Sequence, residues 1–195
     1  MPHIDVDDCV LVVIDAQTDF YGGSRSDVDR LALTTALARV GWVCGVATAL
    51  GVPVIVTEED APANGPTADA VSRWLPVGTV AHDKRVFGAG DDPAIDRAVR
   101  VHGRGTVVLV GMETDVCVAH SALGWGATGL RAIVVRDAVF SAGAAHGYGL
   151  QRLAEERIEL LSAKELYYEW LRTLAAVREF DAAHPGLATP PGFSL

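Results

Sequence analysis

Short apolar runs alternate along this chain with longer amphipathic segments. The first run, Cys9 to Ile14, is rich in β-branched residues and stops at Asp15, which is typical of a strand buried on both faces. Similar runs predict strands at residues 53–57, 106–110, 132–135 and 158–161, and a weaker strand at 77–81. Helical patterns predict helices at residues 27–50, 67–75, 93–101, 115–126, 144–156 and 163–176, and a loop at 62–66.

Strands separated by helices imply right-handed crossovers and a parallel sheet covered by helices. The alternation therefore predicts a single-domain, three-layer α/β/α fold of the Rossmann-like kind with a mostly parallel central sheet. We expect this domain to span residues 1–181. Residues 182–195 are rich in Pro and Gly, and we expect them to form a tail that either wraps a neighbour or frays.

Composition narrows the class of protein. The formal net charge is −9 and no basic run occurs, which argues against a nucleic-acid-binding surface. We expect no membrane span, because the apolar runs are short and interrupted. The N-terminus carries Asp5, Asp7 and Asp8 where a signal peptide carries positive charge, and three cysteines without a CxxC pair indicate reduced thiols. These features predict a soluble, cytoplasmic protein.

Three residues with reactive side chains follow predicted strands. Asp15 ends the first strand, Lys84 follows the weak third one, and Cys117 comes seven residues after Val110. In a parallel sheet all three emerge at the same rim, where ligands bind. A helix N-terminus and the Lys84 ammonium would lower the pKa of the Cys117 thiol, and Asp15 would serve as base. Taken singly, each residue has a commoner structural role, as a cap, a solvated cation or a buried small apolar group.

Four strings give these residues a context. They are LVVIDAQTDF (Leu11 to Phe20), DKRVFGA (Asp83 to Ala89), GMETDVCVAHSALGWGATG (Gly111 to Gly129) and VVRDAVFS (Val134 to Ser141). In this order and spacing they resemble the isochorismatase-like (cysteine hydrolase) superfamily, from about Cys9 to Leu174.

The resemblance implies a role for each residue. Asp15 would be the base, Lys84 the stabilising cation and Cys117 the nucleophile of a catalytic triad. A cis peptide between Met112 and Glu113 would aim the Glu113 N–H beside that of Cys117, forming an oxyanion hole. The implied function is cofactor-free hydrolysis through a thioester-type covalent intermediate.

One stretch departs from part of the family. The nicotinamidase branch carries metal-binding histidines after the second strand, where this chain has the acidic turn Glu58-Glu59-Asp60. We interpret this turn as solvated, predict no catalytic metal and expect no nicotinamidase activity. Because true isochorismatases do not depend on a cysteine nucleophile, Cys117 favours hydrolysis of a C–N bond in a small amide or carbamoyl compound.

Substrate contacts and partners are predicted more coarsely. We expect Gln17, Phe20, Phe87 and His120 to line the pocket of a small-molecule substrate. Family members commonly oligomerise, so a homo-oligomer is expected, and the apolar stretch Leu166 to Leu174 is either a contact of this kind or the domain's own closing helix. The alternative is a catalytically silent or redox-sensing protein that binds a small molecule on the same fold.

Overall fold

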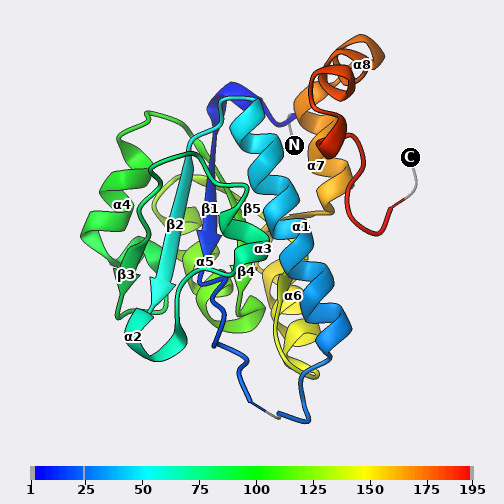
Figure 1. The fold of residues 1–195 in the computed structure, drawn as a ribbon. Coiled ribbons are helices and arrows are strands. Elements are labelled where there is room, and N and C mark those ends of the chain that lie inside the picture. The colour runs from blue at the N-terminus through cyan, green and yellow to red at the C-terminus, as the bar shows by residue number, and fades with distance from the viewer. Residues whose placement is uncertain (1–2, 24, 194–195) are drawn as a thin grey trace.

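Six parallel strands form one central sheet in the computed structural model, which describes residues 3–23 and 25–193 (Figure 1). Their order is β3-β2-β1-β4-β5-β6, so β1 and β4 lie at the centre. The strands are β1 (Cys9–Ile14), β2 (Val54–Glu59), β3 (His82–Lys84), β4 (Thr106–Met112), β5 (Arg131–Phe140) and β6 (Glu159–Leu161). The predicted three-layer α/β fold is confirmed, and every strand pair in the sheet is parallel.

Helices cover both faces of this sheet. The α-helices are α1 (Arg30–Ala49), α2 (Ala61–Asn64), α3 (Asp69–Ser72), α4 (Pro93–Arg100), α5 (Ala119–Ala127), α6 (Ala145–Glu155), α7 (Ala163–Leu171) and α8 (Leu174–Ala183). Three short 3-10 turns are η1 (Val6–Asp8), η2 (Ala89–Asp91) and η4 (Pro185–Leu187), and a π-helical turn, η3 (Thr114–Val118), precedes α5. One core cluster joins the sheet to α1 and α7, and a second joins its other face to α4, α5 and α6.

Strand β1 illustrates why its residues form a central strand. Leu11 and Val13 belong to the first core cluster, whereas Val12 and Ile14 belong to the second. All six residues of the strand are buried, as the continuous apolar run predicts. The residue directly after the strand, Asp15, therefore lies at the centre of the sheet's carboxyl edge.

Helix α1 lies within the range predicted for it, 27–50, and is strongly apolar. By length and composition alone it is the one described helix able to cross a membrane. In the fold it is a core helix, because Val40, Val43 and Val46 are completely buried in the cluster beneath it. Helix α3 and the turn η4 also contact α1.

Three local predictions are wrong. The third strand is His82–Lys84 and not 77–81, since its polar residues give no apolar signal and only pairing with β2 defines it. The expected loop at 62–66 contains the end of the short helix α2. The helix expected at 163–176 is two helices, because Arg172 adopts a left-handed conformation with φ of 60°.

The C-terminal segment packs on its own chain. The Trp42 indole donates a hydrogen bond to the Leu187 carbonyl at 2.9 Å, and Arg39 donates to the Pro191 carbonyl at 3.0 Å. The Leu187 side chain is buried. Up to residue 193, therefore, this segment packs against α1 of its own chain.

Candidate active site

Asp15 lies directly after β1, with its carboxylate completely buried. Its φ is 44°, a left-handed conformation that Asp tolerates better than most residues. The Thr57 hydroxyl donates a hydrogen bond to Asp15 Oδ1 at 2.7 Å, and Lys84 Nζ lies 2.7 Å from Oδ2. The bend after β1 thus turns the carboxylate toward the ends of β2 and β3.

Lys84 ends β3 and is also buried. Its ammonium lies 2.7 Å from the Asp15 carboxylate, 3.0 Å from the Val86 carbonyl and 3.6 Å from Cys117 Sγ. An ammonium group has three donors, and each is directed at one of these acceptors. The cation is therefore held between the carboxylate and the thiol.

Cys117 belongs to the π-helical turn η3, which connects β4 to α5. Its side chain is 1 % exposed. Ser121, one turn further along, accepts from the Ala89 amide and donates to the Cys117 carbonyl at 2.6 Å. This arrangement ties the turn that carries Cys117 to the loop that follows Lys84.

The predicted triad residues thus meet at one rim of the sheet, although 102 positions separate the first from the last. They reach this rim from three elements: the end of β1, the end of β3 and the turn after β4. We call Asp15, Lys84 and Cys117 the acid–lysine–thiol cluster.

Burial governs the protonation of this cluster. It raises the pKa of the Cys117 thiol above its ordinary value, and the neighbouring Asp15 carboxylate raises it further, whereas Lys84 lowers it. Burial also raises the pKa of Asp15, against the opposing effects of Lys84 and Thr57. Burial alone would lower the pKa of Lys84, but the charge and hydrogen bond of Asp15, together with Cys117 and Glu59, outweigh it and the pKa is raised. The lowering of the Cys117 pKa that we expect from Lys84 is therefore opposed by burial and by the Asp15 carboxylate.

The peptide bond between Met112 and Glu113 is cis. The Tyr21 hydroxyl donates a hydrogen bond to the Glu113 carboxylate at 2.8 Å. The next two residues are held as well, Thr114 by His146 at 2.9 Å and Asp115 by the Ser141 hydroxyl at 2.6 Å. The backbone proposed as an oxyanion hole is thus anchored on both sides of Glu113.

Glu59 is a functional candidate that the sequence analysis missed. Its Oε2 lies 3.8 Å from Cys117 Sγ, so it belongs to the site and not to a solvated turn. The rest of the acidic turn has other partners, since Glu58 accepts bonds from Thr67 and Asp60 pairs with Arg85. No pattern in the sequence distinguishes these three carboxylates, because only the pairing of β2 with β3 places Glu59 beside Lys84.

The residues expected to line the pocket differ in their burial. Gln17 is buried, with its amide bonded to the backbone of Glu59 and Gly65. Phe20 lies edge-on to Tyr21, with ring centroids 5.5 Å apart. Phe87 and His120 are exposed and face each other at 6.1 Å. Gln17 therefore supports the site from behind, and Phe87 and His120 lie on the surface beside it.

The donor set for a cation is poor. Among the described residues, Asp15, Glu59 and Cys117 have ligand atoms within 4.8 Å of one another. However, the Lys84 ammonium already lies against two of these three groups. A metal ion there would have to displace a buried cation, so the residues do not fit a resident metal.

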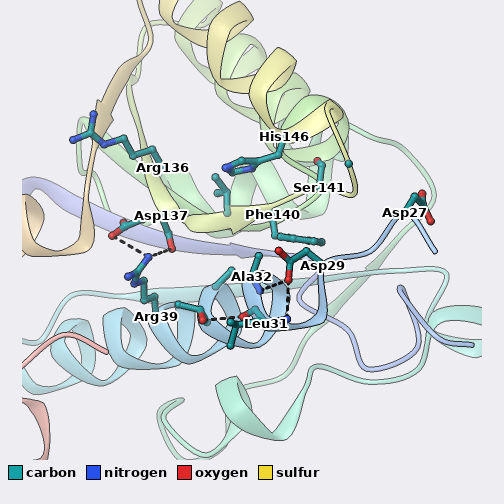
Figure 2. Close-up of a pocket in the computed structure, with 14 residues that line it drawn as sticks. Asp27, Asp29, Leu31, Ala32, Arg39, Arg136, Asp137, Phe140, Ser141 and His146 are labelled. Carbon is teal, nitrogen blue, oxygen red and sulfur yellow. Dashed lines mark hydrogen bonds and ion pairs between the residues drawn. The ribbon is translucent and has the colours of Figure 1, made fainter. Parts of the chain in front are cut away.

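A cavity of about 540 Å³ lies behind the η3 turn, between the start of α1 and the end of β5 (Figure 2). Among the described residues, no member of the acid–lysine–thiol cluster lines it. Its walls include Phe140 and His146, and Arg39 pairs with Asp137 at 3.6 Å across its edge. Two of its lining residues, His146 and Ser141, form hydrogen bonds with the side chains of Thr114 and Asp115 in η3.

Fold and cluster together define a class: a three-layer α/β protein with a thiol, a carboxylate and an ammonium at the carboxyl edge of a parallel sheet. The model of the isochorismatase domain matches residues 9–165. The chain therefore belongs to the isochorismatase family and has the fold of a hydrolase. No curated protein matches the sequence.

Solved structures with the same fold are distant in sequence. The MAR1 ribonuclease from Caenorhabditis elegans is 21% identical with a TM-score of 0.83, covering 100% of this chain and 98% of that one. YcaC from Pseudomonas aeruginosa, solved with hexane-2,5-diol and covalent acrylamide, is 20% identical (TM-score 0.80, covering 95% and 94%). The Escherichia coli YcaC gene product, described as an octameric hydrolase of unknown specificity, is 20% identical (TM-score 0.77, covering 95% and 92%). At these identities the likeness establishes the fold.

Proposed function

We propose that this protein is a cysteine-dependent hydrolase that cleaves the C–N bond of a small amide or carbamoyl compound. The observation that carries the proposal is the position of the Lys84 ammonium, 2.7 Å from the Asp15 carboxylate and 3.6 Å from the Cys117 sulfur. Burying these groups together is unfavourable unless their interactions compensate, and such clusters are concentrated at active sites.

The first half-reaction forms a thioester. The Cys117 thiol transfers its proton to Asp15 as the sulfur attacks the carbonyl carbon. The negative charge that develops on the carbonyl oxygen is held by the backbone N–H groups of Glu113 and Cys117. Collapse of this intermediate breaks the C–N bond, and Asp15 returns the proton to the leaving nitrogen.

The second half-reaction releases the acid. Water attacks the thioester carbon and gives a proton to Asp15, and collapse breaks the C–S bond. The proton on Asp15 returns to the sulfur, which restores the neutral thiol. Lys84 remains protonated throughout and stabilises whichever of Asp15 and Cys117 is negative. A raised pKa suits Asp15 to this task, because a base must also be able to give the proton back.

Release of ammonia from a panel of primary amides, carbamates and N-carbamoyl amines tests the function. We expect turnover by the wild type, and loss of turnover with an intact fold in Cys117→Ala and Asp15→Asn. If Cys117→Ala releases ammonia at the wild-type rate, the cysteine mechanism is wrong.

Alkylation of the thiol tests the role of Lys84 separately. Because the ammonium lowers the pKa of Cys117, we expect Lys84→Ala to slow alkylation by iodoacetamide at neutral pH. Cys9 is the internal comparison, since it begins β1, at the opposite end of the strand from Asp15, and burial raises its pKa to about 11. Equal alkylation rates of Cys117 in the wild type and the variant would contradict this role.

We further propose that the protein forms a homo-oligomer, as the octameric E. coli structure suggests. The exposed apolar side chains Val77, Val80 and Phe87, next to the site, are suited to such a contact. Sedimentation velocity measures the number of subunits directly, and a monomer at all concentrations would refute the proposal.

A further inference from the structure

We infer that Glu59 determines specificity: its carboxylate makes the site accept neutral or cationic amides and reject amides that carry a carboxylate. This inference rests on the proposed function, because it concerns substrates that react at Cys117. It starts from the 3.8 Å contact between Glu59 Oε2 and Cys117 Sγ.

The position of Glu59 is fixed by its backbone. Its amide donates to Gln17 Oε1 at 2.8 Å, and its carbonyl accepts from Gln17 Nε2 at 3.1 Å and from Asn64 Nδ2 at 2.9 Å. On its other side Glu59 pairs with Lys84 in the β2–β3 ladder. The side chain therefore starts from a fixed point one strand away from Lys84, from which its carboxylate reaches the sulfur.

Glu59 also lies on the solvent side of the sulfur. Asp15, Lys84 and Cys117 are almost completely buried, whereas Glu59 is only partly buried. A molecule that approaches the thiol from solvent consequently passes this carboxylate. Groups attached to the reacting carbonyl then lie within a few ångströms of its charge.

The charges of the site do not balance. Lys84 forms its ion pair with Asp15, at 2.7 Å, although the Glu59 charge also acts on it, and burial of Cys117 favours the uncharged form of the thiol. In the part of the chain that the structure describes, no Lys, Arg or His forms an ion pair with Glu59 within 4.0 Å. One negative charge therefore remains next to the sulfur. A second carboxylate on the substrate would be repelled at short range in a poorly solvated place, whereas an ammonium or an N–H donor would be attracted.

Three amides of equal length test this selectivity. Glycinamide is cationic at pH 6.5, propionamide is neutral and malonamate is anionic, and all three are primary amides. For the wild type we expect kcat/KM to fall in that order, by about tenfold or more at each step. In Glu59→Gln, which keeps the shape and removes the charge, we expect the ratio of glycinamide to malonamate to shrink at least about tenfold.

Asp60→Asn is the matched control. It removes the same charge one residue away, from a side chain that pairs with Arg85 on the outside of the turn, and Asn tolerates the left-handed backbone at this position. We expect its ratios to equal those of the wild type. An equal loss of kcat/KM for all three amides in Glu59→Gln would overturn the inference, because it would indicate a role in proton transfer and not in selection.

Thiol reagents provide a readout that needs no turnover. Methanethiosulfonates with a cationic ethylammonium, a neutral methyl or an anionic ethylsulfonate group modify thiols by one reaction, and mass spectrometry locates the adduct on Cys117. For the wild type we expect the ratio of the cationic to the anionic modification rate to exceed the ratio for a small free thiol at least about tenfold. In Glu59→Gln this ratio should fall toward the value for the free thiol. In Asp60→Asn it should stay at the wild-type value.

The two proposals fail in different ways. If Cys117 shows the charge preference but no amide is hydrolysed, the proposed function is wrong and the effect of Glu59 on the thiol is upheld. If amides are hydrolysed but neither ratio changes in Glu59→Gln, the proposed function is upheld and the specificity role of Glu59 is overturned. A Cys117 that no reagent modifies overturns both.

Discussion

Gly111 shows how closely β1 and β4 approach each other next to the cluster. Its φ is 115°, and an added Cβ would lie 1.9 Å from the Ile14 carbonyl oxygen. The sequence analysis included this residue in a family string, but the reason for a glycine is the contact with β1 just before Asp15. Only glycine fits there, because both the conformation and the space exclude a side chain.

We therefore expect Gly111→Ala to lower the free energy of unfolding by about 3 kcal/mol or more, measured by urea denaturation. Gly124→Ala is the control, since Gly124 lies in α5 with nothing within 4 Å of an added Cβ. That substitution should be neutral or stabilising by up to about 1 kcal/mol, because alanine favours the helix. Similar stabilities of the two variants would contradict the close approach.

Thr57 adjusts the base. Its hydroxyl hydrogen bond at 2.7 Å lowers the pKa of Asp15, whose burial raises it. In the proposed mechanism Asp15 must be deprotonated to accept the thiol proton, so we expect activity to be lost as the pH falls through its pKa. Removing the hydroxyl in Thr57→Val raises that pKa further, and we expect the acid limb of kcat/KM to move to higher pH by about one unit.

Thr57→Ser keeps the hydroxyl and should retain the wild-type limb. An unchanged acid limb of kcat/KM in Thr57→Val would show that another group controls the acid side of the pH profile.

The raised pKa of Cys117 has its own consequence at high pH. Alkylation should continue to accelerate above the pKa of an ordinary thiol, about 8.5, because the thiolate forms later in this site.

At the scale of elements, apolar strands were predictable and polar ones were not. The β-branched runs of β1 and β4 locate both strands. Asp15 and Cys117 come after the ends of these strands, which places them at the carboxyl rim of the sheet. Strand β3 consists of His82, Asp83 and Lys84 and is defined by its pairing with β2. Because this pairing connects residues about 25 positions apart, no local pattern reveals it, and the role of Glu59 was hidden for the same reason.

The break between α7 and α8 depends on a cap. Thr173 accepts a hydrogen bond from the Ala176 amide at 3.1 Å, which begins α8 directly after the left-handed Arg172. We expect Thr173→Ala to lower the free energy of unfolding by about 1 kcal/mol. Thr173→Ser should be close to the wild type by the same urea titration. If Thr173→Ala is as stable as Thr173→Ser, the cap does not determine where α8 begins.

At the scale of the whole molecule, the alternation of strands and helices was enough to predict a three-layer α/β fold, because each apolar strand must be covered on two faces. It was not enough for the ends of the chain. The Pro- and Gly-rich composition of residues 182–195 indicates only that they are unsuited to regular structure. It does not predict where they pack, because that depends on a surface formed by α1. Gly45 provides part of that surface, since an added Cβ there would lie 2.7 Å from the Leu187 side chain.

We therefore propose that the C-terminal segment up to residue 193 belongs to the folded unit, and Leu187 tests this. Its side chain is 6 % exposed and packs in the main core cluster, so Leu187→Ala should cost about 2–4 kcal/mol of unfolding free energy. Leu174→Ala is the matched control, because Leu174 at the start of α8 is 73 % exposed and its truncation should cost less than about 0.5 kcal/mol. If both variants lose equally little, the segment separates from α1 before the domain unfolds, and the Trp42–Leu187 hydrogen bond contributes nothing to global stability.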